Sequence, residues 1–280
     1  MKQIIAPVAA LAFAIVRAFL AGALAEPGTG FMPRGAGLFV LTLLAAAAVA
    51  GWQWSRGIPA SCRLGGGQEG GEEEPAGTGR ADTLGVLSIL LAAAGLLAGA
   101  ALAFVWRGRL WLPVVVSAVV SAICLTLLIP AASGRRLRDK AAMEGLLLLP
   151  LSVYGMFALL YAYLAGKNLI YVQENTLTLL CCAALLMAIY ADSRCWVGFE
   201  PVRRTVFWLT AAAFLCTAAS LPMTLLRLTT SVVSTTSAPG LDLVNAGFAL
   251  YLWRRAAALQ EFGIRLKRER RKQAPTDAGG

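Results

Sequence analysis

Arg17 is a charged residue inside an apolar segment, and it restricts the chemistry of this chain more than any other residue. A charge near the centre of a bilayer costs about 2.5–3.5 kcal/mol, so it usually faces the bundle interior and has a partner there. Counted from the side with most basic residues, Arg17 lies about 21 Å deep and Asp242 about 17 Å deep. We therefore predict that Arg17 and Asp242 pair. The alternatives are that Arg17 extends toward the surface, or that Asp242 begins the last helix at the outer surface.

The segment 229–245 is the second candidate for chemistry, because seven hydroxyl side chains precede Pro239-Gly240 and are followed by Asp242 and Asn245. A helix broken at Pro239-Gly240 would expose backbone groups at membrane depth, which is how many transporters build ion and substrate sites. An external loop followed by a short helix from near Pro239 is the interpretation we favour. Arg17, Asp242 and Asn245 are thus candidates for an intramembrane polar pair or solute site, with a purely structural role equally open.

The C-terminal segment 254–272 has eight basic residues against two glutamates. Leu259, Phe262 and Leu266 follow one another at helical spacing and form a narrow apolar stripe. This pattern is typical of a membrane-surface helix attracted to anionic lipid, although a charge cluster that only sets membrane orientation is an alternative. Nucleic-acid binding is not expected, because the segment is tethered and lacks interleaved aromatic residues. The candidate lipid contacts are Arg254, Arg255, Arg265, Lys267, Arg268, Arg270, Arg271 and Lys272.

The residue inventory argues against an enzyme. The chain has no histidine, which removes imidazole bases, Ser-His and Cys-His nucleophiles and His-based zinc sites. No phosphate-binding glycine loop with its lysine is present. Cys181 and Cys182 point about 100° apart on a helix, which suits small packing residues better than one metal ion. We expect a protein without catalytic residues, metal or cofactor.

The elements that position these residues are apolar helices. Of 280 residues, 58% are hydrophobic and only 14% charged, whereas soluble domains carry about a quarter charged residues. Alternation of period two is absent, so the pattern predicts an all-α, polytopic bundle of about eight transmembrane helices rather than a barrel. The last segment is the weakest, since its first half is rich in Ser and Thr. The predicted segments are 3–25, 35–54, 83–106, 110–132, 145–165, 175–191, 205–226 and 232–253.

Basic residues orient this bundle. Nineteen of the 25 Lys and Arg residues fall on one side of the eight segments and five on the other, with Arg17 between them. Because basic residues accumulate in the cytoplasm, both termini are expected there, in a plasma membrane. The organisation is then helices 1–2 in 1–54, a flexible Gly/Glu-rich cytoplasmic loop in 55–82, helices 3–8 in 83–253, and a basic cytoplasmic tail in 254–280.

Three smaller features have two interpretations each. Lys2, the apolar run and the triplet Ala23-Leu24-Ala25 resemble a cleaved signal peptide, but Arg17 interrupts the run and favours a retained helix. Gly95 and Gly99 fit close helix packing better than a dimer interface. Tyr154 and Tyr161 share a face, and packing is favoured over a solute-lining stripe.

Two functional hypotheses remain. The first is a non-enzymatic membrane scaffold or regulatory subunit acting through helix contacts and a basic cytoplasmic face, with the bilayer, anionic lipids and other membrane proteins as partners. The second is a transporter or permease-like protein for a small solute, with a site near Arg17, Asp242 and Asn245. A polar path through several helices would favour the second, yet the first four segments contain few polar groups.

Overall fold

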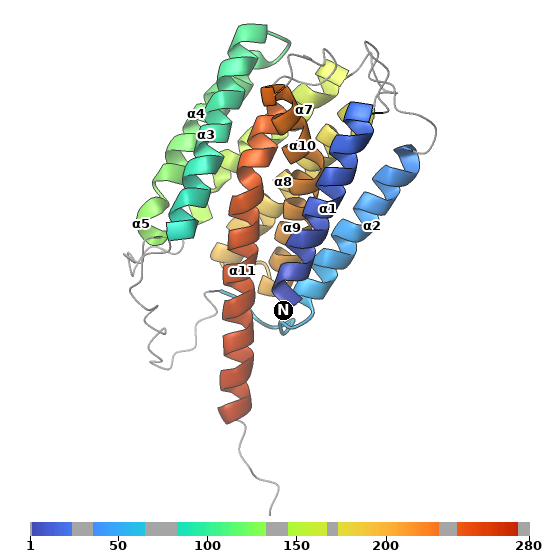
Figure 1. Ribbon diagram of the computed structural model, residues 1–280. Helices are drawn as coiled ribbons and strands as arrows, with labels where there is room; N and C mark the ends of the chain where they lie inside the picture. The colour runs from blue at the N-terminus through green and yellow to red at the C-terminus, as the bar shows by residue number, and fades with distance from the viewer. Residues whose placement is uncertain are drawn as a thin grey trace, which may run out of the picture.

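The computed structural model describes residues 2–23, 36–64, 83–132, 145–166, 173–229 and 240–273. Within these ranges every element is a helix and no strand occurs, as Figure 1 shows. The elements are α1 (Lys2–Ala23), α2 (Ala36–Ser55), α3 (Thr83–Trp106), α4 (Trp111–Thr126), α5 (Ile129–Ala132), α7 (Leu149–Gly166), α8 (Gln173–Trp196), α9 (Val202–Leu215), the π-helix η1 (Cys216–Ser220), α10 (Leu221–Thr229) and α11 (Leu241–Gln273).

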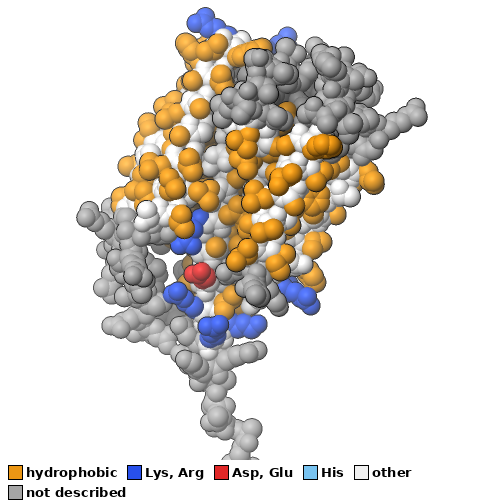
Figure 2. Space-filling view, viewed as in Figure 1, with side chains coloured by type: hydrophobic (Ala, Val, Ile, Leu, Met, Phe, Trp, Pro, Cys, Tyr) orange, Lys and Arg blue, Asp and Glu red, His pale blue; other side chains and the backbone are white. Residues whose placement is uncertain are grey.

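Five of the described helical stretches are long and apolar enough to cross a membrane. The apolar parts of α1 and α4 are shorter, at Ile4–Phe19 and Trp111–Thr126. Figure 2 shows an exterior dominated by hydrophobic side chains, with Lys and Arg gathered mainly at one end. The expectation of an all-α chain with several membrane-crossing helices is therefore confirmed. The five stretches are Leu38–Ser55, Thr83–Trp106, Gly145–Ala165, Thr176–Trp196 and Val202–Leu225.

The helices run up and down in one bundle (Figure 1). α1 and α2 flank one side and α3 and α4 the other, while α11 packs against both α3 and α9. α8 packs between α7 and α9, and α2 packs on α9. The N-terminus lies at the end of the bundle from which the C-terminal half of α11 projects (Figure 1).

Small residues bring α3 and α11 into contact. A Cβ on Gly247 would lie 2.8 Å from the carbonyl oxygen of Leu91, and one on Gly95 3.0 Å from that of Leu243. Gly240 has a φ of +91° and also touches the backbone of Gly99, so no other residue fits there. The packing interpretation of Gly95 and Gly99 is confirmed, and their partner is α11 of the same chain.

The segment predicted at 205–226 contains a π-helix. In η1 the backbone takes i→i+5 hydrogen bonds, which open the helix by one residue, often at functional sites. Thr217 and Thr224, each four residues after its acceptor, donate their hydroxyls to the carbonyls of Ala213 and Ser220 at 2.7 and 2.9 Å. Trp253 of α11 donates its indole N–H to Thr217 Oγ1 at 3.0 Å. The wide turn is thus bonded to α11.

Residues 55–64, predicted as the beginning of a flexible linker, are packed. Ile58 and Cys62 are buried in the core, and the Val202 amide donates to the Cys62 carbonyl at 2.9 Å. The reason is local, since the Gly- and Glu-rich composition begins only after Leu64. Residues 65–82 lie outside the described part of the chain, as does 230–239, which includes most of the predicted Ser/Thr-rich segment.

The predicted domain boundary at residue 254 lies within one helix. α11 continues from Leu241 to Gln273, and its second half projects straight from the bundle (Figure 1). The stripe of Leu259, Phe262 and Leu266 packs on the protein core rather than lying free for lipid. Gly263 lets this half approach residue 58, since a Cβ there would lie 2.8 Å from an Ile58 side-chain carbon.

Candidate functional site

Arg17, Asp242 and Asn245 are all buried inside the bundle. Their exposed fractions are 2%, 4% and 1%, which are low for a charged or amide side chain. Arg17 lies in the last third of α1, and Asp242 lies in the first turn of α11, so all three residues belong to the same end of the bundle (Figure 1). We refer to these residues, with Thr178, Cys181, Cys182 and Ser220, as the outer polar cluster.

Helix α8 provides the polar neighbours of this cluster. Thr178 donates its hydroxyl to Asp242 Oδ1 at 3.3 Å, and Asn245 Nδ2 donates to the thiol sulfur of Cys182 at 3.9 Å. The thiol of Cys181 donates to the Leu215 carbonyl at 3.6 Å and lies within electrostatic range of both Arg17 and Asp242. The predicted residues are therefore brought together around two adjacent cysteines, whereas direct pairing of Arg17 with Asp242 stays a prediction.

Two backbone features lie beside Asp242. It lies in the first turn of α11, where unpaired N–H groups and the helix dipole stabilise negative charge. The other wall of the cluster is η1, against which α1, α8 and α11 all pack. Ser220 ends η1, and its buried hydroxyl lies beside the Cys181 thiol. The cluster thus combines opposite charges, an amide and a hydroxyl.

The chemistry open to this arrangement is recognition by charge and hydrogen bonds. In the described ranges, no group of three or more Cys, Asp or Glu residues converges as metal ligands would. Asp242 is the carboxylate that this part of the structure places in the cluster.

A second buried charge group lies at the opposite end of the same two helices. Arg255 of α11 donates through Nε to Asp192 of α8, at 3.1 Å to Oδ1 and 3.0 Å to Oδ2. The side chains are 17% and 2% exposed, and the guanidinium lies 4.4 Å from the ring centroid of Trp196. Burial alone would lower the pKa of Arg255, but the Asp192 carboxylate outweighs it and raises that pKa. We call Asp192, Trp196 and Arg255 the inner clamp.

The inner clamp was not predicted from the sequence. The predicted segment 175–191 ends just before Asp192, but α8 continues to Trp196 and buries this residue. Arg255 was assigned to lipid, but its guanidinium is turned into the bundle toward a carboxylate. Glu200 lies at the same end and forms ion pairs with Arg204 at 3.1 Å and with Arg194 at 3.7 Å.

An apolar layer separates the two groups. Asn245 and Arg255 are ten residues apart on α11, which is about 15 Å along the helix. Between them, Phe248 and Leu252 are fully buried, and Leu185 and Ile189 of α8 belong to the same buried core. Along α11, the outer polar cluster and the inner clamp are therefore separated by buried apolar side chains.

The other predicted lipid contacts are spread along the projecting half of α11. Arg265, Lys267 and Arg268 are exposed there, and Arg254 is half-buried. Arg270, Arg271 and Lys272 belong to the helix, but their side chains lie outside the description. Tyr154 and Tyr161, which were predicted to pack, are both buried.

Fold and site together define an all-helical protein with five helices fit to cross a membrane, a buried polar cluster at one end and a charged clamp at the other. Searches with protein-family models, among curated proteins and among solved structures find no match to this chain.

Proposed function

We propose that this chain is a non-enzymatic membrane scaffold or regulatory subunit whose working element is the projecting half of α11. In this proposal, eight spans cross a plasma membrane, formed by α1, α2, α3, α4, α7, α8, the α9–η1–α10 unit and the first half of α11. Both termini then lie in the cytoplasm, in agreement with the distribution of basic residues.

The observation that carries the proposal is how firmly the bundle holds α11. The inner clamp fixes the helix where it leaves the core. Beyond it, Gln260 Nε2 donates to the Trp54 carbonyl at 3.1 Å and Lys267 Nζ to the Gly57 carbonyl at 3.5 Å. A helix fixed at several points keeps its charged side chains in one position relative to the membrane, which a docking element requires.

The direction of α11 favours a protein partner over lipid for its last basic residues. Arg265 and Arg268 lie about 18 and 22 Å beyond Trp253 at 1.5 Å per residue. A headgroup layer adds roughly 5–7 Å to each side of the hydrocarbon, and charges are screened beyond about 8 Å at physiological salt. These side chains thus lie at or beyond the level of Gly57, past the end of α2, and an acidic surface of another protein is the partner that we propose for them.

Site-specific photo-crosslinking in native membranes tests this proposal. A photoreactive residue at Glu261, beside the basic side chains, should give a discrete protein adduct, whereas one at Val105, exposed near the opposite end, should not. Adduct formation should be lost in Arg265→Glu/Lys267→Glu/Arg268→Glu. If the adduct persists in this triple variant, or if Val105 gives the same adduct, the basic arm is not the docking element.

A second candidate function is binding of a small polar solute, and the outer polar cluster favours it. Buried ionisable residues within membrane helices commonly mark ligand or ion pathways, and π-turns often lie beside them. Thermal stability of the purified protein with ions, amino acids, sugars and nucleotides tests this. A ligand at 100 times its Kd adds about 2.7 kcal/mol. Its effect should vanish in Asp242→Ala and remain in Ser88→Ala, whose buried hydroxyl bonds its own helix far from the cluster.

A further inference from the structure

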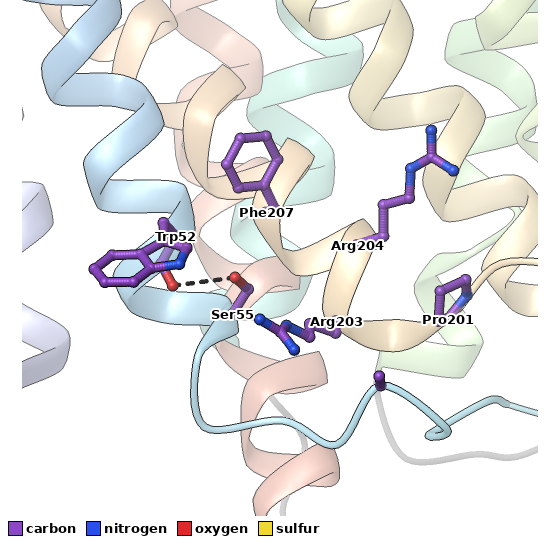
Figure 3. Close-up of a pocket in the computed structure, with 7 residues that line it drawn as sticks. Trp52, Ser55, Pro201, Arg203, Arg204 and Phe207 are labelled. Carbon is purple, nitrogen blue, oxygen red and sulfur yellow. Dashed lines mark hydrogen bonds between the residues drawn. The ribbon is translucent and has the colours of Figure 1, made fainter.

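A cavity of about 260 Å³ lies between the ends of α2 and α9, outside both charge groups. Figure 3 shows Trp52 and Ser55 on the α2 side and Arg203 and Phe207 on the α9 side. Ala60 of the packed segment 55–64 contributes the remaining edge. This is the end of the molecule where basic residues gather, and the exposed indole of Trp52 is typical of a membrane–water interface.

The walls of this cavity are fixed by close packing. A Cβ on Gly51 would lie 2.8 Å from the Phe207 carbonyl oxygen, so α2 and α9 touch directly beside the cavity. The bond from the Val202 amide to the Cys62 carbonyl holds the segment 55–64 at the beginning of α9. The Ser55 hydroxyl bonds the Trp52 carbonyl at 3.1 Å and closes the end of α2.

The charge of the cavity comes from Arg203. Figure 3 shows its guanidinium turned toward Ser55 and α2, while Arg204 points away from Trp52. Arg204 is neutralised by Glu200 at 3.1 Å, but Arg203 has no carboxylate partner in the described part of the chain. Arg56 does not line the cavity, but its guanidinium lies 4.4 Å from the centroid of the Trp52 ring, which does. Arg203 also lies in the first turn of α9, where the helix dipole favours an anion.

We propose that this cavity binds the phosphate of an anionic phospholipid, with Arg203 and Arg56 as its cationic contacts and the Trp52 indole beside the glycerol. Arginine suits a phosphate because its planar donors bind two oxygens at once. The cavity is smaller than sites that enclose a drug-sized molecule, which fits a headgroup with its chains outside. The exposed Val49 and Leu41 of α2 provide an apolar surface for those chains.

This inference goes beyond the scaffold role. It requires only that this end of the bundle lie at a bilayer surface, so it can fail or hold independently of the projecting arm. A free phosphate compound shares the same chemistry, and the test has to separate it from a lipid.

The experiment is a lipid titration of the full chain in detergent, read by thermal stability. Phosphatidylglycerol should stabilise the wild-type protein, and phosphatidylcholine should do so far less. Arg203→Gln should weaken the apparent affinity for phosphatidylglycerol roughly ten-fold, the size of one charge-assisted contact of about 1.4 kcal/mol. Arg268→Gln removes the same charge from the projecting half of α11 and should change it less than about two-fold.

Two results would overturn the assignment. Equal losses in Arg203→Gln and Arg268→Gln would mean that net charge, not this cavity, attracts the lipid. Stabilisation by inorganic phosphate or ATP equal to that by phosphatidylglycerol would make the ligand a soluble phosphate. A photoreactive phosphatidylglycerol provides a measurement on the unaltered chain: adducts are expected within 52–60 and 201–207, and adducts confined to 259–268 would refute the site.

Discussion

The outer polar cluster and the inner clamp are built on the same two helices, but they hold their charges differently. Two hydrogen bonds described for Asp242 and Asn245 are 3.3 and 3.9 Å long, and the second is accepted by a thiol sulfur. Around Asp192 the Arg255 guanidinium approaches both carboxylate oxygens within 3.1 Å and stacks on Trp196. A thiol acceptor and a π-helix characterise the outer polar cluster, whereas a short ion pair characterises the inner clamp.

This difference indicates that the inner clamp has the more rigid, structural role. An ion pair with short bonds and a stacked aromatic ring leaves little freedom, and removing one partner strands a buried charge. Hydrogen bonds to thiols are weak, so their loss to another partner costs little. The inner clamp is thus suited to fixing the projecting helix, and the outer polar cluster is suited to rearrangement.

The largest expected effect comes from breaking the inner clamp. Asp192→Ala leaves the Arg255 guanidinium buried without its carboxylate and should lower the free energy of unfolding by about 3–5 kcal/mol. The measurement is an SDS titration of the purified protein in mixed micelles. Replacing both partners, as Asp192→Leu/Arg255→Met, should recover most of the loss, and a double variant as unstable as the summed singles would show that the pair is not coupled.

A smaller effect is expected at the outer polar cluster. Asp242→Ala removes the acceptor of the Thr178 hydroxyl and should cost about 1–3 kcal/mol. If Arg17 and Asp242 pair as predicted, a cycle with Arg17→Ala should give a coupling energy above about 0.5 kcal/mol. Additive losses in the same SDS titration would contradict the pair and leave two independently buried side chains.

The bond between α11 and the π-helix should contribute less than either charge group. Trp253→Phe removes the indole N–H that Thr217 accepts and should cost about 1 kcal/mol, with faster hydrogen exchange in 216–220. The matched control is Trp111→Phe, which alters an indole on α4. Equal exchange changes in both variants would mean that Trp253 does not stabilise the π-helix.

The smallest effect is expected where the projecting half of α11 meets residue 54. Gln260→Ala removes one bond to a carbonyl at a half-buried position and should cost about 0.5 kcal/mol. Its consequence should be local, as faster hydrogen exchange in 258–266 with the bundle unchanged. Faster exchange throughout α11 would show that the helix is not held separately below the inner clamp.

Much of this arrangement could be predicted from the sequence. Apolar length located the first seven segments within about five residues, because a bilayer imposes one minimum length on every span, but the last, predicted at 232–253, is helical over Leu241–Gln273. The depth argument favoured buried positions for Arg17 and Asp242, and Asn245 was a candidate because it follows Pro239-Gly240; all three are buried. The count of Lys and Arg residues predicted which end of the bundle carries most of the basic side chains.

The rest depended on contacts between distant residues. Asp192 and Arg255 are 63 positions apart, and each belonged to a charged stretch that reads as solvated, so nothing local marked them as a pair. The π-helix replaces one hydrogen-bond register by another without changing hydropathy. The cavity beside Trp52 depends on Gly51 meeting Phe207. The stripe on α11 suggested a lipid surface because the packing of 55–64 against it is not encoded in periodicity.

The central claim is that α11 projects from the bilayer instead of lying on it, and the depth of residue 272 tests it most directly, because this residue lies about 18 Å along the helix beyond Gln260, which bonds Trp54. A genetically encoded fluorophore at Lys272 is measured in phosphatidylglycerol nanodiscs with a headgroup-borne quencher, and one at Arg56 serves as the interfacial reference. We predict strong quenching at 56 and little at 272. Equal quenching at both positions would place this half of α11 on the membrane surface and contradict the scaffold proposal.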